Sequence, residues 1–272
     1  MRRLSSPLLA ALVAVSVSVL LGQTPDAAQV ISSAREALGG EKKLSAVRTF
    51  TATGRTRQIR GNNLVPIEFE INCELPDKFV RKDEIPAQDT DPTTRGFSGE
   101  TLIQFPPPGA GRGGARAGGP SLGGPPPGGG RGPGGPVPPI VAVKQDFARL
   151  MLGMFAASFP SFPLTFKYAA IGEAPEGQAD ILEVAGPANF STRFVVQRGT
   201  HLPVMLMWSA PAPGQPAPAE QRMYFADYRE VDGLKLPFRI RRAVGADTVE
   251  ETTFDRFRIN AKIDPRKFEI PK

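Results

Sequence analysis

The side chains best suited to chemistry are few in this chain, and their spacing does not favour an enzyme. His201 is the only histidine, and it lies in a hairpin-like sequence where a lone histidine is ordinary surface. One such residue supports neither a Ser-His-Asp triad nor a multi-histidine metal site. Glu68, Glu70 and Glu74 share one face of a strand, but the opposite face is apolar, so a solvated outer face explains them better than paired catalytic carboxylates. Because few polar groups converge, we expect no enzymatic activity, no metal and no cofactor.

The elements that would position any site are mostly strands. Near the C-terminus, apolar residues alternate with charged ones at or near period two, the spacing of a half-buried strand. They are Met223 and Phe225, then Leu234, Leu236, Phe238 and Ile240, then Phe254, Phe257 and Ile259. The sequence 231–233 (Val-Asp-Gly) is a tight turn, because Gly supplies the positive φ that such turns need. Three antiparallel strands with one apolar face are therefore predicted.

The same patterns predict the other elements. Helices are expected at 26–38 and 140–158. Strands are expected at 49–59, 65–74, 79–85, 94–96, 100–105, 164–171, 179–184, 192–197, 202–208 and 221–228, followed by the final pair. About eleven antiparallel strands with two or three helices indicate a mainly β (α+β) protein. A continuous sheet of this size must curl or close.

One segment, residues 106–139, interrupts this pattern. It is almost entirely Gly and Pro with scattered arginines, so it cannot bury enough surface to offset the entropy of ordering, and we expect it to be disordered. We interpret it as an insertion within a single domain that spans 23–272. The formal net charge of +6 is mild and dispersed, which gives no reason to expect a nucleic-acid partner.

The first 22 residues have the pattern of a secretory signal peptide. A basic start, Arg2 and Arg3, precedes an apolar run at 8–21 that is too short to span a bilayer. Gln23 stands where a bacterial lipoprotein would carry its lipidated cysteine. We therefore expect an exported, periplasmic protein without a lipid anchor.

The abundant Phe and Met residues gather on the strands and helix that would face one another. Two interpretations are open: a packed core, or an apolar cavity lined by adaptable side chains. If it is a cavity, its wall would be formed by Ile67, Phe69, Ile71, Phe147, Met151, Phe155, Leu206, Trp208, Phe225 and Phe238.

Four stretches together resemble the LolA/LolB-like superfamily of periplasmic lipoprotein carriers. They are Ala34–Gly40 in the first helix, Val47–Gly54 opening the first strand, Tyr224–Phe238 across the late hairpin, and Thr252–Ile263 in the closing strand. The resemblance covers the chain after the leader except for 106–139. It implies a curved antiparallel half-barrel whose concave apolar face is covered by helices.

The resemblance also implies a function: a monomeric, soluble carrier that binds acyl chains of lipoproteins or lipids. Such a carrier would exchange its cargo with membrane-bound loading and receiving partners. A second interpretation, from another class, is a periplasmic sensor module similar to the RseB proteins, which bind a regulatory partner. A secreted hydrolase on an unfamiliar β fold is disfavoured by the shortage of convergent polar groups.

Overall fold

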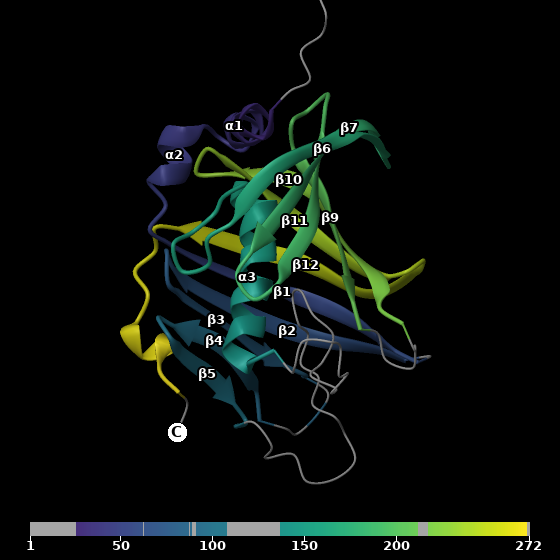
Figure 1. Ribbon diagram of the computed structural model, residues 1–272. Coiled ribbons are helices and arrows are strands. Elements are labelled where there is room, and N and C mark those ends of the chain that lie inside the picture. The colour runs from purple at the N-terminus through teal and green to yellow at the C-terminus, as the bar shows by residue number, and fades with distance from the viewer. Residues whose placement is uncertain are drawn as a thin grey trace, which may run out of the picture.

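A computed structural model describes residues 26–61, 63–86, 88, 91–107, 137–211 and 217–270 (Figure 1). The helices are α1 (Ala27–Ala37), α2 (Glu41–Ser45), α3 (Pro139–Phe155) and the 3-10 helix η1 (Pro265–Phe268). The strands are β1 (Thr49–Arg60), β2 (Asn63–Glu74), β3 (Lys78–Glu84), β4 (Thr93–Ser98), β5 (Thr101–Phe105), β6 (Thr165–Ala174), β7 (Gly177–Gly186), β8 (Phe190–Gln197), β9 (Pro203–Ala210), β10 (Ala219–Val231), β11 (Leu234–Val244) and β12 (Asp247–Ile259). The predicted leader, Gln23 and positions 108–136 of the predicted insertion lie outside the described residues.

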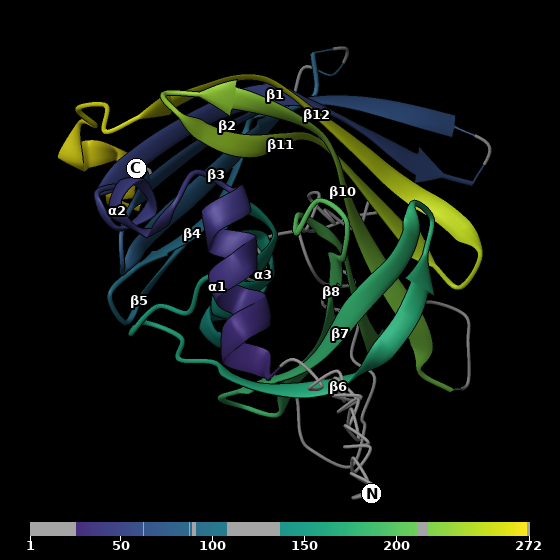
Figure 2. The same ribbon diagram turned by 90° about the horizontal axis from the view of Figure 1, so that it is seen from above.

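All twelve strands form one antiparallel sheet in the order β5-β4-β3-β2-β1-β12-β11-β10-β9-β8-β7-β6. Each strand pairs with its sequence neighbours, except that β5 and β6 lie at opposite edges and β1 pairs with β12 near the centre, where Phe50 lies opposite Ile259. Figure 2 shows the sheet curving around α3, with β5 and β6 as its two edges. The expected curved half-barrel is confirmed, with twelve strands where about eleven were predicted.

The concave face is apolar because the strands alternate as their sequences predict. In β11, Leu234, Leu236 and Ile240 are buried in the core, while Lys235 is exposed. β12 departs from strict alternation, since Phe254 and Phe257 are three residues apart and both are buried. A β-bulge explains this spacing: Gly54 pairs with Phe254 and Thr53 with Arg256, so the chain gains one residue between them and the inward parity shifts.

α3 fills the concave face. Of its 17 residues, 12 are buried, and Pro139 occupies the first turn, where its missing N–H has no cost. The helix was predicted to continue to residue 158, but it ends at Phe155 because Ala156 adopts a left-handed conformation with φ of 46°. Gly153 lets the helix approach the sheet closely: a Cβ there would lie 2.0 Å from Cε1 of Phe225.

The N-terminal helices lie over one end of the half-barrel (Figures 1 and 2). α1 begins with a capping box in which Asp26 and Gln29 bond to each other's backbone N–H groups. Arg35 connects three helices, because its Nη1 donates to the carbonyl of Phe155 at 3.0 Å and its Nη2 to Oε1 of Glu41 at 2.9 Å. Within the described part of the chain, no helix is both long and apolar enough to cross a membrane.

Candidate ligand-binding site

The structure buries every predicted wall residue. None of the ten is more than 6% exposed. Nine of them belong to one apolar cluster, and Ile67 is buried outside it. Trp208 also lines the cleft described below, and Phe155 lines a smaller pocket next to α1.

In this conformation the wall residues pack as a core. The ring of Phe147 lies 5.5 Å from that of Phe79 and 5.3 Å from that of Phe97, at tilted and edge-to-face angles. The ring of Phe155 lies 5.8 Å from that of Phe50. These are the separations of ordinary aromatic pairs in protein interiors. A role of these residues in ligand binding therefore stays a prediction that requires α3 to move.

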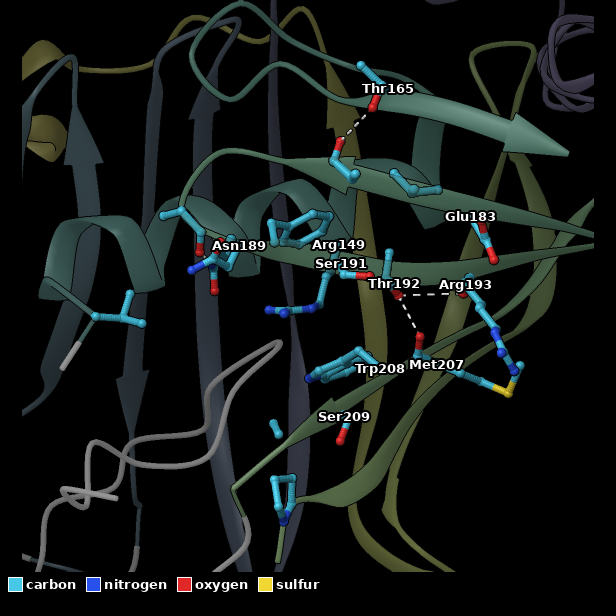
Figure 3. Close-up of a pocket in the computed structure, with 18 of the residues that line it drawn as sticks. Arg149, Thr165, Glu183, Asn189, Ser191, Thr192, Arg193, Met207, Trp208 and Ser209 are labelled. Carbon is cyan, nitrogen blue, oxygen red and sulfur yellow. Dashed lines mark hydrogen bonds between the residues drawn. The ribbon is translucent and has the colours of Figure 1, made fainter. Parts of the chain in front are cut away.

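A cleft of about 1330 Å³ lies between the start of α3 and the ends of β6 to β9. Figure 3 shows the Arg149 side chain of α3 extending into it above the ring of Trp208. The rim is polar and includes Thr165, Asn189 and Ser209. The cleft thus has polar residues at its opening. On its inner side it is lined by β9, whose inward side chains belong to the apolar core.

Two aromatic rings hold the Arg149 guanidinium. Its Cζ lies 4.4 Å from the ring centroid of Trp208 and 4.9 Å from that of Phe190. Both distances are in the range of cation–π contacts, which are strongest when water is excluded. Asp146, one helical turn earlier, accepts from Nη1 of Arg149 at 3.3 Å.

A tight hairpin places Phe190 over Arg149. Ala188 and Asn189 both have positive φ, at 52° and 58°, and the N–H of Phe190 donates to the carbonyl of Pro187. This is the geometry of a type I′ turn. Gln145 of α3 donates to the carbonyl of Ala188 at 3.3 Å, so the helix that carries Arg149 also fixes the turn.

Arg149 belongs to a larger group of buried charges on the concave side, here called the charged cluster. Its members are Arg81, Asp83, Asp146, Arg149, Arg242 and Glu250, each at most 7% exposed. Arg81 Nε lies 2.7 Å from Asp83 Oδ1, and Arg242 Nη1 lies 3.7 Å from Glu250 Oε2. Such burial is costly unless each charge is compensated, so the cluster requires explanation.

Burial shifts the pKa values within the charged cluster. Desolvation lowers the pKa of Arg149 to about 10, with Asp146 opposing the shift and Arg242 adding to it, and the guanidinium stays charged at neutral pH. Desolvation raises the pKa of Glu250 against the influence of Arg242 and Arg81. It likewise raises the pKa of Asp83 against Arg81. The carboxylates of Asp83 and Glu250 are therefore less strongly ionised than exposed ones.

The other residues singled out from the sequence lie away from this cluster. His201 is exposed in the turn between β8 and β9. Glu70 pairs with Lys267 and Glu74 with Lys78, on the face opposite the core. Among the residues that the structure describes, no group of three or more His, Cys, Asp or Glu side chains could hold a metal ion.

Sequence comparison gives no relatives: no protein-family model matches the chain, and no curated protein does. Solved structures do match. A LolA superfamily protein from Nitrosomonas europaea superimposes with a TM-score of 0.56 at 11% identity, covering 90% of this chain and 99% of that one. The fold is LolA-like.

Two further structures agree at lower similarity. A DUF1329 family protein from Desulfovibrio piger gives a TM-score of 0.50 at 8% identity over 90% of this chain and 98% of that one. A protein domain from Vibrio parahaemolyticus ascribed to outer membrane lipoprotein sorting gives 0.50 at 8% identity over 88% and 95%. The resemblance inferred from the four sequence stretches is thus confirmed at the level of the fold.

The LolA-like fold brings together charges that the sequence analysis did not connect. Few convergent polar groups were expected, yet six charged side chains meet inside the half-barrel. The sequence did contain a signal. Asp146 and Arg149 interrupt the apolar stripe of α3, and Arg81, Asp83 and Arg242 occupy inward positions of β3 and β11, where alternation calls for apolar residues.

Proposed function

We propose that this protein is a non-enzymatic carrier that binds the acyl chains of lipoproteins or lipids against the concave face of its half-barrel. The observation that carries the proposal is the construction of that face: an extended apolar surface beside the charged cluster, against which one helix, α3, packs. The LolA-like fold supports it, since one structural neighbour is ascribed to outer membrane lipoprotein sorting. Acyl chains suit a surface of Phe and Met side chains, which adapt to flexible apolar ligands.

The conformation described here is the closed one. α3 occupies the space that an acyl chain would fill, so we propose that the helix shifts outward and that the chain replaces its contacts with Leu206, Phe225 and Phe238. Met151 and Met154 on the buried side of α3 can then pack against the cargo as they now pack against the sheet. The exchange costs little because one apolar contact replaces another.

The proposed setting is the periplasm, where the protein would take cargo from one membrane-bound partner and deliver it to another as a monomer. This rests on the signal-peptide pattern at 1–22 and on Gln23 in the position of a lipidated cysteine. Without an acyl anchor of its own, such a protein can leave a membrane, because even one acyl chain gives only marginal membrane affinity.

The direct test is native mass spectrometry of protein purified from a membrane-containing host, together with titration of a fluorescent fatty acid. We expect co-purifying lipid and saturable binding. Phe225→Glu places a charge on the concave wall beneath α3, and Val195→Glu places one in a separate buried cluster made by alternate residues of the same sheet. Both variants bury an uncompensated charge, so they carry similar risks to stability.

The two variants separate a cavity from a solid core. Loss of fatty-acid binding in folded Phe225→Glu, with binding retained in Val195→Glu, supports the proposal. If the wild-type protein carries no lipid and binds no fatty acid, the proposal is wrong.

A further inference from the structure

The buried guanidinium in the cleft points to a specific ligand class. We propose that Arg149, with Trp208 and Gln221 beside it, forms an anion-binding site that receives the carboxylate or phosphate headgroup of an amphiphilic ligand. This inference rests on the proposed function, because it assigns the headgroup of the ligand whose chain the concave face would hold.

The first argument is unused donor capacity. A guanidinium stacked between two rings can accept hydrogen-bond partners only along its edge, where its five N–H groups point. Nη1 of Arg149 faces Asp146, whereas Nε has no hydrogen-bond partner among the described residues, although the side chain is only 7% exposed. A buried charged donor without a partner is costly, and a carboxylate or phosphate oxygen is the partner that matches it best.

A second donor lies close by. Gln221 of β10 is 2% exposed and pairs directly opposite Trp208 of β9, so the two side chains share the concave face. Its Nε2 has no hydrogen-bond partner within the described part of the chain either. Each of these two unsatisfied buried N–H donors therefore neighbours Trp208, Arg149 through its contact with the indole ring and Gln221 through its cross-strand pairing.

The charge balance favours an anion. Arg95 Nη1 lies 4.0 Å from Asp146 Oδ2, so it joins the cluster at the edge and shares Asp146 with Arg149. Among the described residues the cluster then holds four arginines and three carboxylates, a surplus of one positive charge (4 − 3) contributed by Arg95, whose side chain is 31% exposed. One bound anion would neutralise this surplus.

The position of the site also predicts which way the apolar chain of a bound ligand would extend. Leu206 lies two residues before Trp208 on β9 and faces the same way, about 7 Å farther along the strand, and it is fully buried in the apolar cluster. On α3, Arg149 stands one turn before Gly153 and Met154, which pack in the same cluster. A ligand with its headgroup at Arg149 would thus extend its chain under α3, along the predicted wall.

The experiment compares ligands that differ only in their headgroup. Isothermal titration calorimetry would measure the binding of dodecanoate, dodecanol and inorganic phosphate to the full-length protein. Trp208 is the only tryptophan, so its fluorescence reports on this cleft alone. We expect dodecanoate to bind about tenfold to a hundredfold more tightly than dodecanol, the range of a charge-assisted hydrogen bond, and to change the Trp208 emission.

The variants locate the preference. Arg149→Met keeps a side chain of similar length, and it should remove the preference for dodecanoate while leaving the affinity for dodecanol unchanged. Asp146→Asn/Arg149→Met removes both members of the pair, so it guards against misfolding caused by the loss of Arg149 beside a charged Asp146. Arg55→Met removes an exposed arginine that pairs with Asp255, and it should behave as the wild type.

Each outcome decides between the two proposals. Equal binding of dodecanoate and dodecanol, or a preference that survives in Arg149→Met, overturns the headgroup site and leaves the carrier intact. A Trp208 response to phosphate, without binding of either amphiphile, overturns the carrier and identifies a site for a free anion. No response to any of the three ligands overturns both.

Discussion

The Arg81–Asp83 pair shows how the charged cluster is balanced at the level of single residues. The two side chains are neighbours on the inward face of β3, and Arg81 also donates to Thr56 Oγ1 at 3.0 Å and stacks 4.5 Å from the ring of Phe69. Removing one member leaves the other as a buried charge without its main partner, whereas removing both restores an apolar surface.

We therefore expect Arg81→Leu to lower the free energy of unfolding by about 3–5 kcal/mol, and Arg81→Leu/Asp83→Leu to cost less than the single change. Urea denaturation of the wild type, the two single variants and the double variant would measure the coupling. A double variant less stable than either single variant would show that the pair is itself stabilising.

A second residue-level prediction concerns pH. Hydrogen bonds from Arg35 and Ser45 lower the pKa of Glu41 to about 2. Because the folded-state pKa lies below the ordinary value of 4.5, this carboxylate stabilises the fold above pH 4.5, and the stabilisation is lost as the pH falls toward 2. The side chain is exposed, so Glu41→Gln should cost below about 1 kcal/mol at pH 7.

Comparing unfolding at pH 7 and near pH 2 would check this: the difference between Glu41→Gln and the wild type should vanish in acid. Glu36→Gln, an exposed carboxylate on α1, is the matched control for loss of charge. A difference of equal size at both pH values would mean that Glu41 acts through packing and not through its ionisation.

At the level of elements, the close packing of α3 against the sheet depends on Gly153. A methyl group there would overlap the ring of Phe225, at 2.0 Å from Cε1 and 2.1 Å from Cζ. Gly153→Ala should lower the free energy of unfolding by about 1–3 kcal/mol despite the better helix propensity of alanine, because the helix must move off the sheet.

Gly153→Ala/Phe225→Leu tests the cause, since the smaller leucine makes room for the methyl group. Thermal or urea denaturation should show that the double variant is more stable than the sum of the two single effects predicts. If the two losses are additive, the methyl group does not destabilise the protein through its overlap with Phe225.

The sequence predicts the strands of this protein better than its site, and the reason is physical. Alternation along β11 and the helical stripe of α3 each reflect one element at a time, so they can be read locally. The charged cluster arises only when β3, β11, β12 and α3 are brought to one face. Asp146 and Arg149 look like an ordinary helical ion pair until the sheet encloses them. The end of α3 at Phe155 was missed because nothing in the sequence marks Ala156 as left-handed.

For the whole molecule, the composition of residues 106–139 predicts that this segment contributes little to stability. Replacing 109–135 with a flexible linker of about ten residues should leave the free energy of unfolding within about 1 kcal/mol of the wild type, since loop closure depends only weakly on length. Calorimetry would measure the transition. Loss of a single cooperative transition would show that the segment holds the two parts of the sheet together.

The pairing of β1 with β12 has a consequence for how the protein reaches its folded state. The two strands at the middle of the sheet come from opposite ends of the described chain, with Thr51 opposite Arg258. The first five strands and the last seven can each form as local hairpins, but the join between them must wait for the final strand. Contacts this distant in sequence make folding slow. A polypeptide cut short before residue 247 would therefore lose the central seam of the sheet, and two incomplete curved halves would expose apolar faces and unpaired strand edges, the features that lead to aggregation.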